Sequence, residues 1–240
     1  MILFGDRLAQ LIAQRGPICA GIDPRLPQLP QGTDSLTWGV QATRQLASSV
    51  AAIKPQLAFL SDDWEAAAAI AEPARAGGAI VIADCKRGDI GSTAAAYAQR
   101  WLGPEAPFDA ITVNPFLGRD ALEPFVEAAV LQGKGLFVLV RTSNPGGADL
   151  QDLVCADGER VFEHVARLVA DLGAPHVGTH GLSAVGAVVG LTVPRDQVAR
   201  LRALMPHAPF LMPGCGAQGG APAVFAAAQR PGGGGGLGSA

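Results

Sequence analysis

The sequence predicts a single (β/α)₈ barrel, an α/β fold, and three observations lead to this fold class. The chain has 240 residues, half of them hydrophobic, which suits one barrel domain of about 250 residues. Short apolar runs alternate with Ala-, Leu- and Arg-rich stretches of helical period. Polar residues stand at or just after the ends of six of these runs, which favours a barrel over an open doubly wound sheet. They are Asp23, Lys54, Asp84, Asn114, Arg141 and Thr192.

The predicted elements begin with an amphipathic helix within residues 1–16. Asp6 and Arg7 interrupt its apolar stretch, so it does not read as a signal peptide. Seven short strands follow. The nearly continuous Val/Ile/Leu runs among them, without strict alternation, are expected for parallel strands covered on both faces. The seven strands are residues 18–23, 51–56, 79–84, 109–114, 135–140, 185–190 and 209–214.

The C-terminal segment does not fit this pattern. Residues 231–240 read PGGGGGLGSA, with six glycines and no apolar run. We therefore expect one barrel domain over residues 1–230 and a Gly-rich irregular tail over 231–240. The eighth strand and its helix are expected to be missing or replaced by this tail.

Composition excludes several classes of protein. A net charge of -3 gives no field for binding nucleic acid. No apolar run reaches the ~18 residues of a membrane span, and we expect a soluble, cytoplasmic protein. The four cysteines and four histidines lack ligand spacing, which predicts free thiols and no metal.

The pattern Asp84-x-Lys86-x-x-Asp89 is the strongest candidate for catalysis. Asp84 and Lys86 are two residues apart at a strand end, so both project to one side. A lysine between two carboxylates keeps its proton and suits a proton donor better than a Schiff-base nucleophile. The alternative is a solvated charge cluster. The chain has 15 arginines and only three lysines, and two of these, Lys54 and Lys86, occupy strand ends, which favours chemistry.

Two further loops are candidate binding sites. The glycines of PGCGAQGG (213–220), which include Gly219, would let backbone amides approach a phosphate. The same glycines spell G-x-G-x-x-G, but no acidic residue follows about twenty positions later, which argues against a dinucleotide site. RTSNPGG (141–147) is compatible with a simple turn, yet Ser143 offers a hydroxyl at the barrel mouth.

Seven segments in order resemble orotidine 5′-phosphate decarboxylases of the longer bacterial type, from residue 18 to about 220. They are GIDPRLPQLP, IKPQLAF, ADCKRGDIGST, VNPFLGRDAL, VRTSNPGG, VVGLT and PGCGAQGG. The resemblance implies a cofactor-free decarboxylation of orotidine 5′-monophosphate to uridine 5′-monophosphate in pyrimidine synthesis. It also implies a homodimer with shared active sites.

The resemblance also assigns roles to individual residues. Lys86 would protonate ring C6, and Asp84 would face the departing carboxylate. Asp23, Lys54 and Asp89 would complete the charged network around the ribose and Lys86. Further substrate contacts are implied for Thr93, Ser143, Gln218 and Gly219, with Asp89 and Thr93 reaching the neighbouring subunit's site.

One family feature has no counterpart in the sequence. The family ends in an S-S-R-type segment whose arginine grips the phosphate, and Arg230 does not match it. Two alternative functions therefore stay open. One is a metal-dependent sugar-phosphate decarboxylase or synthase of the same superfamily, and the other is a nucleotide-binding protein without catalysis.

Overall fold

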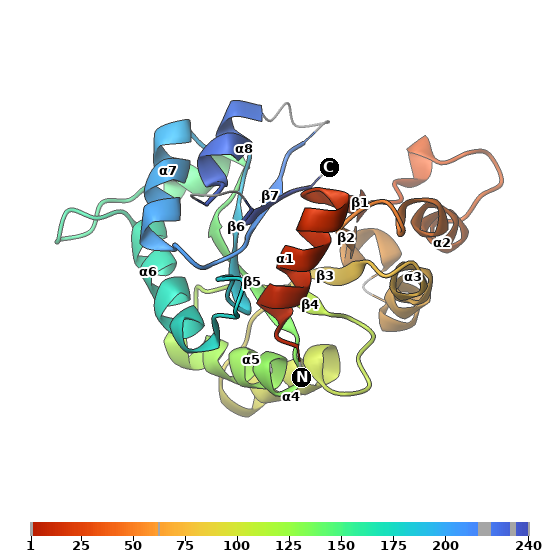
Figure 1. Ribbon diagram of the computed structural model, residues 1–240, viewed down its shortest axis with the longest axis horizontal. Helices are drawn as coiled ribbons and strands as arrows, with labels where there is room; N and C mark the ends of the chain where they lie inside the picture. Colours follow the sequence, from red (N-terminus) through yellow and green to blue (C-terminus); the bar gives the residue numbers. More distant parts are fainter. Residues whose placement is uncertain (1, 62, 216–221, 231–233, 240) are drawn as a thin grey trace.

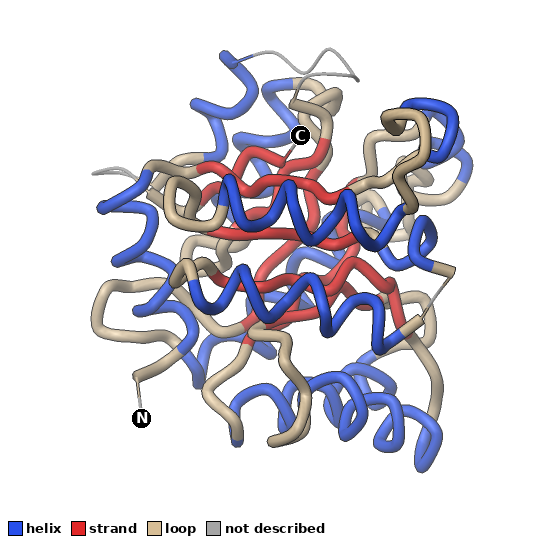
Figure 2. The backbone as a smooth tube through the Cα atoms, turned by 90° about the vertical axis from the view of Figure 1, so that its right-hand side faces the viewer, coloured by secondary structure: helices blue, strands red, loops and turns tan. Residues whose placement is uncertain are grey.

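The structure is a computed structural model that describes residues 2–61, 63–215, 222–230 and 234–239. Eight parallel strands form a closed barrel in which each strand pairs with its sequence neighbours and β8 pairs with β1. Helices α2 to α8 surround the strands (Figure 1), and the strands lie at the centre of the molecule (Figure 2). The predicted (β/α)₈ barrel is therefore confirmed.

The strands are β1 (Ile18–Ile22), β2 (Ala52–Pro55), β3 (Ile80–Arg87), β4 (Ala110–Val113), β5 (Gly135–Arg141), β6 (Val185–Val189), β7 (Phe210–Pro213) and β8 (Gly236–Ser239). The helices are α1 (Phe4–Arg15), α2 (Ser35–Leu46), α3 (Trp64–Ala76), α4 (Gly91–Leu102), α5 (Arg119–Leu131), α6 (Val161–Gly173), α7 (Arg195–Leu204) and α8 (Pro222–Ala228). All seven predicted strands and the N-terminal helix are present.

The expected absence of the eighth strand and helix is wrong. Residues 236–239, placed by the sequence in an irregular tail, pair with β7 from Phe210↔Gly236 to Pro213↔Ser239, and with β1. Leu237 is fully buried. Gly236 lies close to the C-terminal end of α8, since a Cβ there would lie 3.3 Å from the Phe225 ring and 2.8 Å from Gln229 Nε2. Closure of the barrel gives β8 a pairing strand on each side, although its glycine-rich sequence has a low propensity to form a strand.

Helix α1 covers the N-terminal end of the barrel. Its Phe4 ring packs edge-on against Phe137 inside the barrel, with 6.1 Å between ring centroids. Gly135 permits this approach, since a Cβ there would lie 2.4 Å from the Phe4 ring. With this end closed, a binding site is left to the opposite end, where the strands finish. In the part of the chain described, no helix is long and apolar enough to cross a membrane.

Candidate active site

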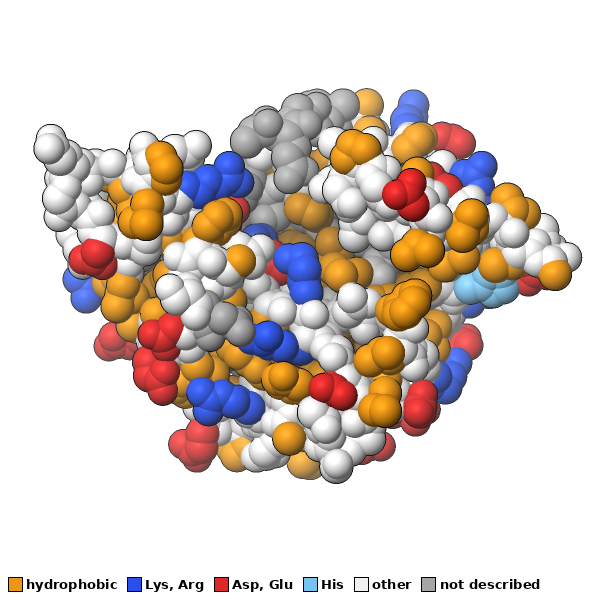
Figure 3. Space-filling model, turned by 180° about the vertical axis from the view of Figure 1, so that it is seen from behind, with side chains coloured by type: hydrophobic (Ala, Val, Ile, Leu, Met, Phe, Trp, Pro, Cys, Tyr) orange, Lys and Arg blue, Asp and Glu red, His pale blue; other side chains and the backbone are white. Residues whose placement is uncertain are grey.

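A cavity of about 460 Å³ lies at the C-terminal ends of the strands. Every strand contributes to its lining. The ends of β1, β2, β3, β5 and β7, or the loops that follow them, provide most of the residues, and β4, β6 and β8 provide one each. The lining includes Asp23, Arg25, Lys54, Gln56, Asp84, Lys86, Thr112, Ser143, Gly214, Cys215 and Ser239. On the face opposite to α1, basic side chains gather beside a hollow in the surface (Figure 3). Five of the predicted site residues, Asp23, Lys54, Asp84, Lys86 and Ser143, thus line one cavity.

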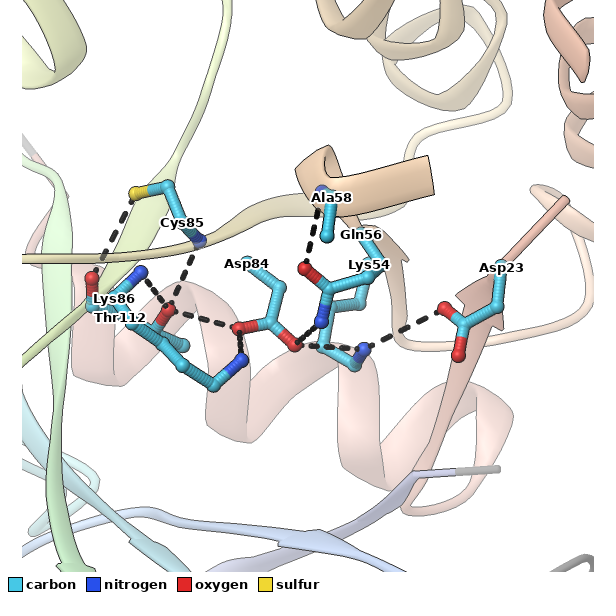
Figure 4. A network of polar contacts seen from close by, with 8 residues as sticks. All are labelled: Asp23, Lys54, Gln56, Ala58, Asp84, Cys85, Lys86 and Thr112. Atoms are coloured by element: carbon cyan, nitrogen blue, oxygen red, sulfur yellow. Dashed lines mark hydrogen bonds and ion pairs between the residues drawn. The ribbon is translucent and has the colours of Figure 1, made fainter. Parts of the chain in front are cut away.

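The Asp84 carboxylate is the centre of this cluster (Figure 4). Its Oδ1 atom accepts hydrogen bonds from the Lys86 ammonium at 2.5 Å and the Thr112 hydroxyl at 2.9 Å. Its Oδ2 atom accepts from Lys54 Nζ at 3.1 Å and Gln56 Nε2 at 2.8 Å. A carboxylate accepts about four hydrogen bonds, so all its capacity is used and its orientation is fixed.

The charges at this centre stabilise one another. Burial alone would raise the pKa of Asp84, but the ammonium groups of Lys54 and Lys86 outweigh it, and the pKa lies below its usual value. Burial likewise opposes the charge of Lys54, but the carboxylates of Asp84 and Asp23 raise its pKa above the ordinary value. Asp84 and Lys54 are therefore both charged at neutral pH.

Asp23 stands at the edge of the cluster, after β1. Its Oδ1 atom lies 4.0 Å from Lys54 Nζ, an ion-pair distance but too long for a hydrogen bond. Among the described residues this buried atom has no hydrogen-bond partner. Asp23 therefore retains acceptor capacity beside the cavity.

The backbone of β3 is irregular at Lys86. Lys86 has a φ of 48°, in the left-handed region that side chains other than glycine rarely adopt. Between Ala83 and Arg87 the register of β3 against β4 shifts, so residues 84–86 form a bulge. The bulge turns the lysine toward the cavity over the end of β4.

Sequence reasoning did not identify Gln56 and Thr112. Gln56 lies two residues after Lys54, and Thr112 lies two residues before Asn114. Each side chain is therefore on the same face of its strand as the predicted residue. A polar residue inside the apolar run of residues 109–114 was the available signal for Thr112. Its partners on β3, however, depend on the register between two strands, which periodicity does not give.

Ser143 lines the cavity from the loop after β5, as predicted. Its backbone lies close to the end of β6, where a Cβ at Gly190 would stand 2.8 Å from Ser143 Cα. The loop is held by the buried Arg141 guanidinium, which donates to the Thr142 carbonyl at 3.0 Å and to Asp152 at 2.9 Å. The Ser143 hydroxyl is therefore presented by a fixed loop.

Asp89 and Thr93 do not join this cavity within one chain. The Asp89 carboxylate accepts a hydrogen bond from the Ile90 amide at 2.8 Å, and in the described ranges it makes no ion pair with Lys86. Thr93 lies exposed near the start of α4. Neither residue is among those that line the chain's own cavity, so their assigned role stays a prediction about a second subunit.

The predicted phosphate loop is only partly within the described chain. Gln218 and Gly219 lie outside the described residues, whereas Gly214 and Cys215 line the cavity next to Ser239 of β8. The Gly214 and Cys215 amides donate to the Ser239 carbonyl at 3.1 and 3.0 Å. Arg230 donates to the His180 carbonyl at 3.0 Å, in the segment before β6, and so lies toward the other end of the barrel.

Two other features are less suited to catalysis. A larger hollow of about 780 Å³ lies beside the loops after β1 and β2, but its acids Asp34 and Asp63 cap α2 and α3. The described chain also places ligand atoms of Asp157, Glu159 and His164 within 4.8 Å of one another on the surface. Spacing in the sequence did not reveal this group. Glu159 already pairs with Arg167 and Arg200, so little charge is left for a cation.

Comparisons with known proteins agree on one family. A model of the orotidine 5′-phosphate decarboxylase / HUMPS family matches residues 17–230. A curated relative from Rhodopirellula baltica, named orotidine 5′-phosphate decarboxylase, is 42% identical over 92% of this chain and 80% of its own length. One of the same name from Haloarcula marismortui is 46% identical over 90% of this chain and 78% of its own length.

The fold comparison gives the same result. The structure of Leishmania donovani OMP decarboxylase has a TM-score of 0.78 and 32% identity, covering 100% of this chain and 89% of that one. The structure of Leishmania donovani UMP synthase has a TM-score of 0.82 and 35% identity, covering 100% of this chain and 51% of the longer one. The barrel and the sequence thus point to the same relatives.

Proposed function

This chain belongs to the orotidine 5′-phosphate decarboxylase / HUMPS family, and from that premise we propose that it converts orotidine 5′-monophosphate to uridine 5′-monophosphate and carbon dioxide. The observation that carries the proposal is the Lys54–Asp84–Lys86 array at the cavity floor, with Nζ–Oδ distances of 3.1 and 2.5 Å. The curated relatives with over 40% identity carry the decarboxylase name, which favours this member of the family over a sugar-phosphate enzyme.

The proposed reaction needs a proton donor and fixed charge, and the array offers both. The bond between ring C6 and the carboxylate carbon breaks, carbon dioxide leaves, and the electron pair stays on C6. The Lys86 ammonium then gives a proton to C6 and becomes neutral, so atoms and charge balance. A preorganised cation beside the developing carbanion lowers the barrier without any rearrangement of solvent.

Asp84 contributes through repulsion and through positioning. A substrate carboxylate placed about 4 Å from Asp84 would be repelled by about 4 kcal/mol at an effective dielectric of 20. If that repulsion were fully relieved as carbon dioxide leaves, it would supply about three decades of rate. Asp84 is suited to this because it is buried and ionised. Binding energy from the remote ribose and phosphate would hold the substrate against the repulsion.

The rest of the cavity is suited to the other parts of the substrate. The Asp23 oxygen that lacks a hydrogen-bond partner would accept from a ribose hydroxyl, and Ser143 would meet the pyrimidine. Lys54 and Lys86 are both engaged by Asp84. In the described lining Arg25 is the remaining cation, and it stacks on Phe59 at 5.3 Å. We therefore expect Arg25 to attract the phosphate, and Gln218 and Gly219 keep the binding role that the sequence predicts for them.

We also propose that the active protein is a homodimer in which Asp89 and Thr93 complete the partner's site. The loops after β3 and β4 meet, since a Cβ at Gly88 would lie 3.2 Å from the Asn114 carbonyl oxygen. Both loops present apolar side chains to solvent: Ile90 is 59% exposed and Phe116 80%. An exposed apolar patch beside the site is typical of a protein interface.

The test is direct. Purified protein is mixed with orotidine 5′-monophosphate, and the loss of substrate absorbance is followed with and without EDTA. We expect turnover that EDTA does not reduce, and none with Lys86→Ala. No turnover at millimolar substrate would reject the decarboxylase function. Activity on a sugar phosphate that EDTA abolishes would favour the alternative enzyme of the same superfamily, and tight binding of a 6-substituted uridine monophosphate without turnover would favour the non-catalytic binder.

A further inference from the structure

Thr112 lies in the middle of β4 and lines the cavity, although its side chain is almost fully buried, with 1% of the residue exposed. Its hydroxyl oxygen takes part in three hydrogen bonds, all to the bulge of β3 (Figure 4). The partners are the amide of Cys85 at 3.1 Å, the amide of Lys86 at 2.9 Å and Asp84 Oδ1 at 2.9 Å. A single side chain therefore contacts three consecutive residues of the proposed catalytic segment.

The chemistry of these groups fixes the direction of each bond. A hydroxyl has one proton and two acceptor lone pairs. The two backbone amides can only donate, so they occupy both lone pairs. An ionised carboxylate can only accept, so the remaining proton must point at Asp84. The Thr112 hydroxyl is thus an obligatory donor to the carboxylate.

The amide contacts matter because this part of β3 has left the regular ladder. Pairing runs from Ala83↔Ile111 directly to Arg87↔Val113, and the intervening amides of Cys85 and Lys86 are bonded by the Thr112 side chain instead. The left-handed conformation of Lys86, with φ of 48°, costs about 1–2 kcal/mol and persists only where surroundings enforce it. The hydroxyl is the group placed to enforce it.

We propose that Thr112 is a positioning residue for the decarboxylation, holding the Lys86 backbone and the Asp84 carboxylate so that the ammonium and the carboxylate face the same reacting atom. This inference rests on the proposed function. In this role the Thr112 hydroxyl does not contact the substrate. Its loss should therefore act on the chemical step and leave the binding of the ribose and phosphate largely intact.

The test compares Thr112→Val, Thr112→Ala and Thr112→Ser in kcat, KM and affinity for a 6-substituted uridine monophosphate. Loss of hydrogen bonds to a charged group and to backbone amides predicts a fall in kcat of about ten- to a hundredfold for Val and Ala. KM should stay within about threefold. Ser keeps the hydroxyl and should recover most of kcat. Thr43→Val is the matched control, a buried threonine of α2 outside the cavity, and should match wild type.

The Ser and Ala variants leave nearly the same space, so their ratio isolates the hydroxyl even if Val fails to fold. Equal kcat for Ser and Ala would overturn the positioning role while leaving the proposed function intact. A fall in kcat matched by an equal rise in KM would also overturn it, since that would mean lost binding. An inactive wild type would instead reject the proposed function itself.

Discussion

At the scale of single residues, the two lysines that pair with Asp84 contribute differently to stability and to catalysis. Lys54 is buried and also lies 4.0 Å from Asp23, so it serves both the fold and the site. The Lys86 side chain is 47% exposed, so its burial contributes little to the core. Removing Lys86 should therefore affect catalysis far more than folding.

We expect Lys86→Ala to lower kcat by at least about a thousandfold, in the range for loss of a general acid, with little change in the melting temperature. Lys134→Ala is the control. Its ammonium binds the carbonyls of Gly103 and Ala106, both at 2.8 Å, away from the cavity. That variant should melt earlier but keep its kcat. Lys86→Ala turnover within tenfold of wild type would remove Lys86 from the mechanism.

Asp84 makes a pH-dependent contribution to stability whose sign follows from its lowered pKa. A carboxylate with a folded pKa below the unfolded value of about 3.9 stabilises fully above that value. The stabilisation is lost as the pH falls through the folded pKa. Asp84→Asn should thus be less stable than wild type by a constant amount from about pH 5 to pH 8. Urea unfolding at several pH values would measure this difference, which should shrink below pH 4. A difference that grows on acidification would contradict the assignment.

The sequence predicts part of this site because strand ends in a parallel barrel share one mouth. Asp23, Lys54 and Asp84 follow from that rule, and Lys86 follows from its spacing to Asp84. However, the rule also selects Asn114, Arg141 and Thr192, which are not among the lining residues of the cavity. Gln56 and Thr112 could not be predicted in this way, because they belong to the site through hydrogen bonds to Asp84 on another strand. The left-handed backbone conformation of Lys86 cannot be predicted from the sequence either, because only the bulge against β4 produces it.

At the scale of secondary-structure elements, the eighth strand shows where sequence patterns fail. Apolar runs identify the seven other strands, whereas β8 has the sequence GLGS and only Leu237 to mark it. Its stability comes from neighbours on both sides and from α7. The buried Arg202 of α7 donates to the carbonyls of Ala228 at 2.8 Å and Gly235 at 3.1 Å, which belong to the end of α8 and the approach to β8.

Arg202→Met should therefore destabilise the eighth unit. It would also remove a donor from the carbonyls of Met205 and Ala208. The carbonyls of Met205 and Gly235 would keep the amides of Ala208 and Phe210 as donors, whereas those of Ala208 and Ala228 would lose the guanidinium with no other donor in the described chain. Two unsatisfied buried carbonyls predict a loss of at least about 2 kcal/mol in unfolding free energy. Arg200→Met, on the same helix, removes exposed pairs with Glu159 and Glu163 and should cost less than about 1 kcal/mol. Urea unfolding compares the two, and equal losses would show that Arg202 does not anchor this unit.

At the scale of the whole molecule, the proposed homodimer would bring residues of a second chain to the site. The cavity is bordered by residues from every strand of the barrel or the loop that follows it, yet Asp89 and Thr93 lie beyond it. The loops after β3 and β4 expose Phe116 and Ile90 next to Asp89. A second copy packed on this patch would bury the apolar side chains and could bring Asp89 to the other site. Oligomeric state and activity should therefore be linked.

Phe116→Glu should separate the subunits, because a carboxylate buried at an interface without a partner is strongly unfavourable. Loss of a central aromatic contact of 2 kcal/mol or more would weaken dimerisation by at least about thirtyfold. Sedimentation at several concentrations should show monomers, and kcat should fall with them. Leu131→Glu is the matched control: Leu131 is 71% exposed at the end of α5, and its variant should remain dimeric and active. A Phe116→Glu monomer with wild-type kcat would mean that one chain holds a complete site and that Asp89 has no role in a partner's.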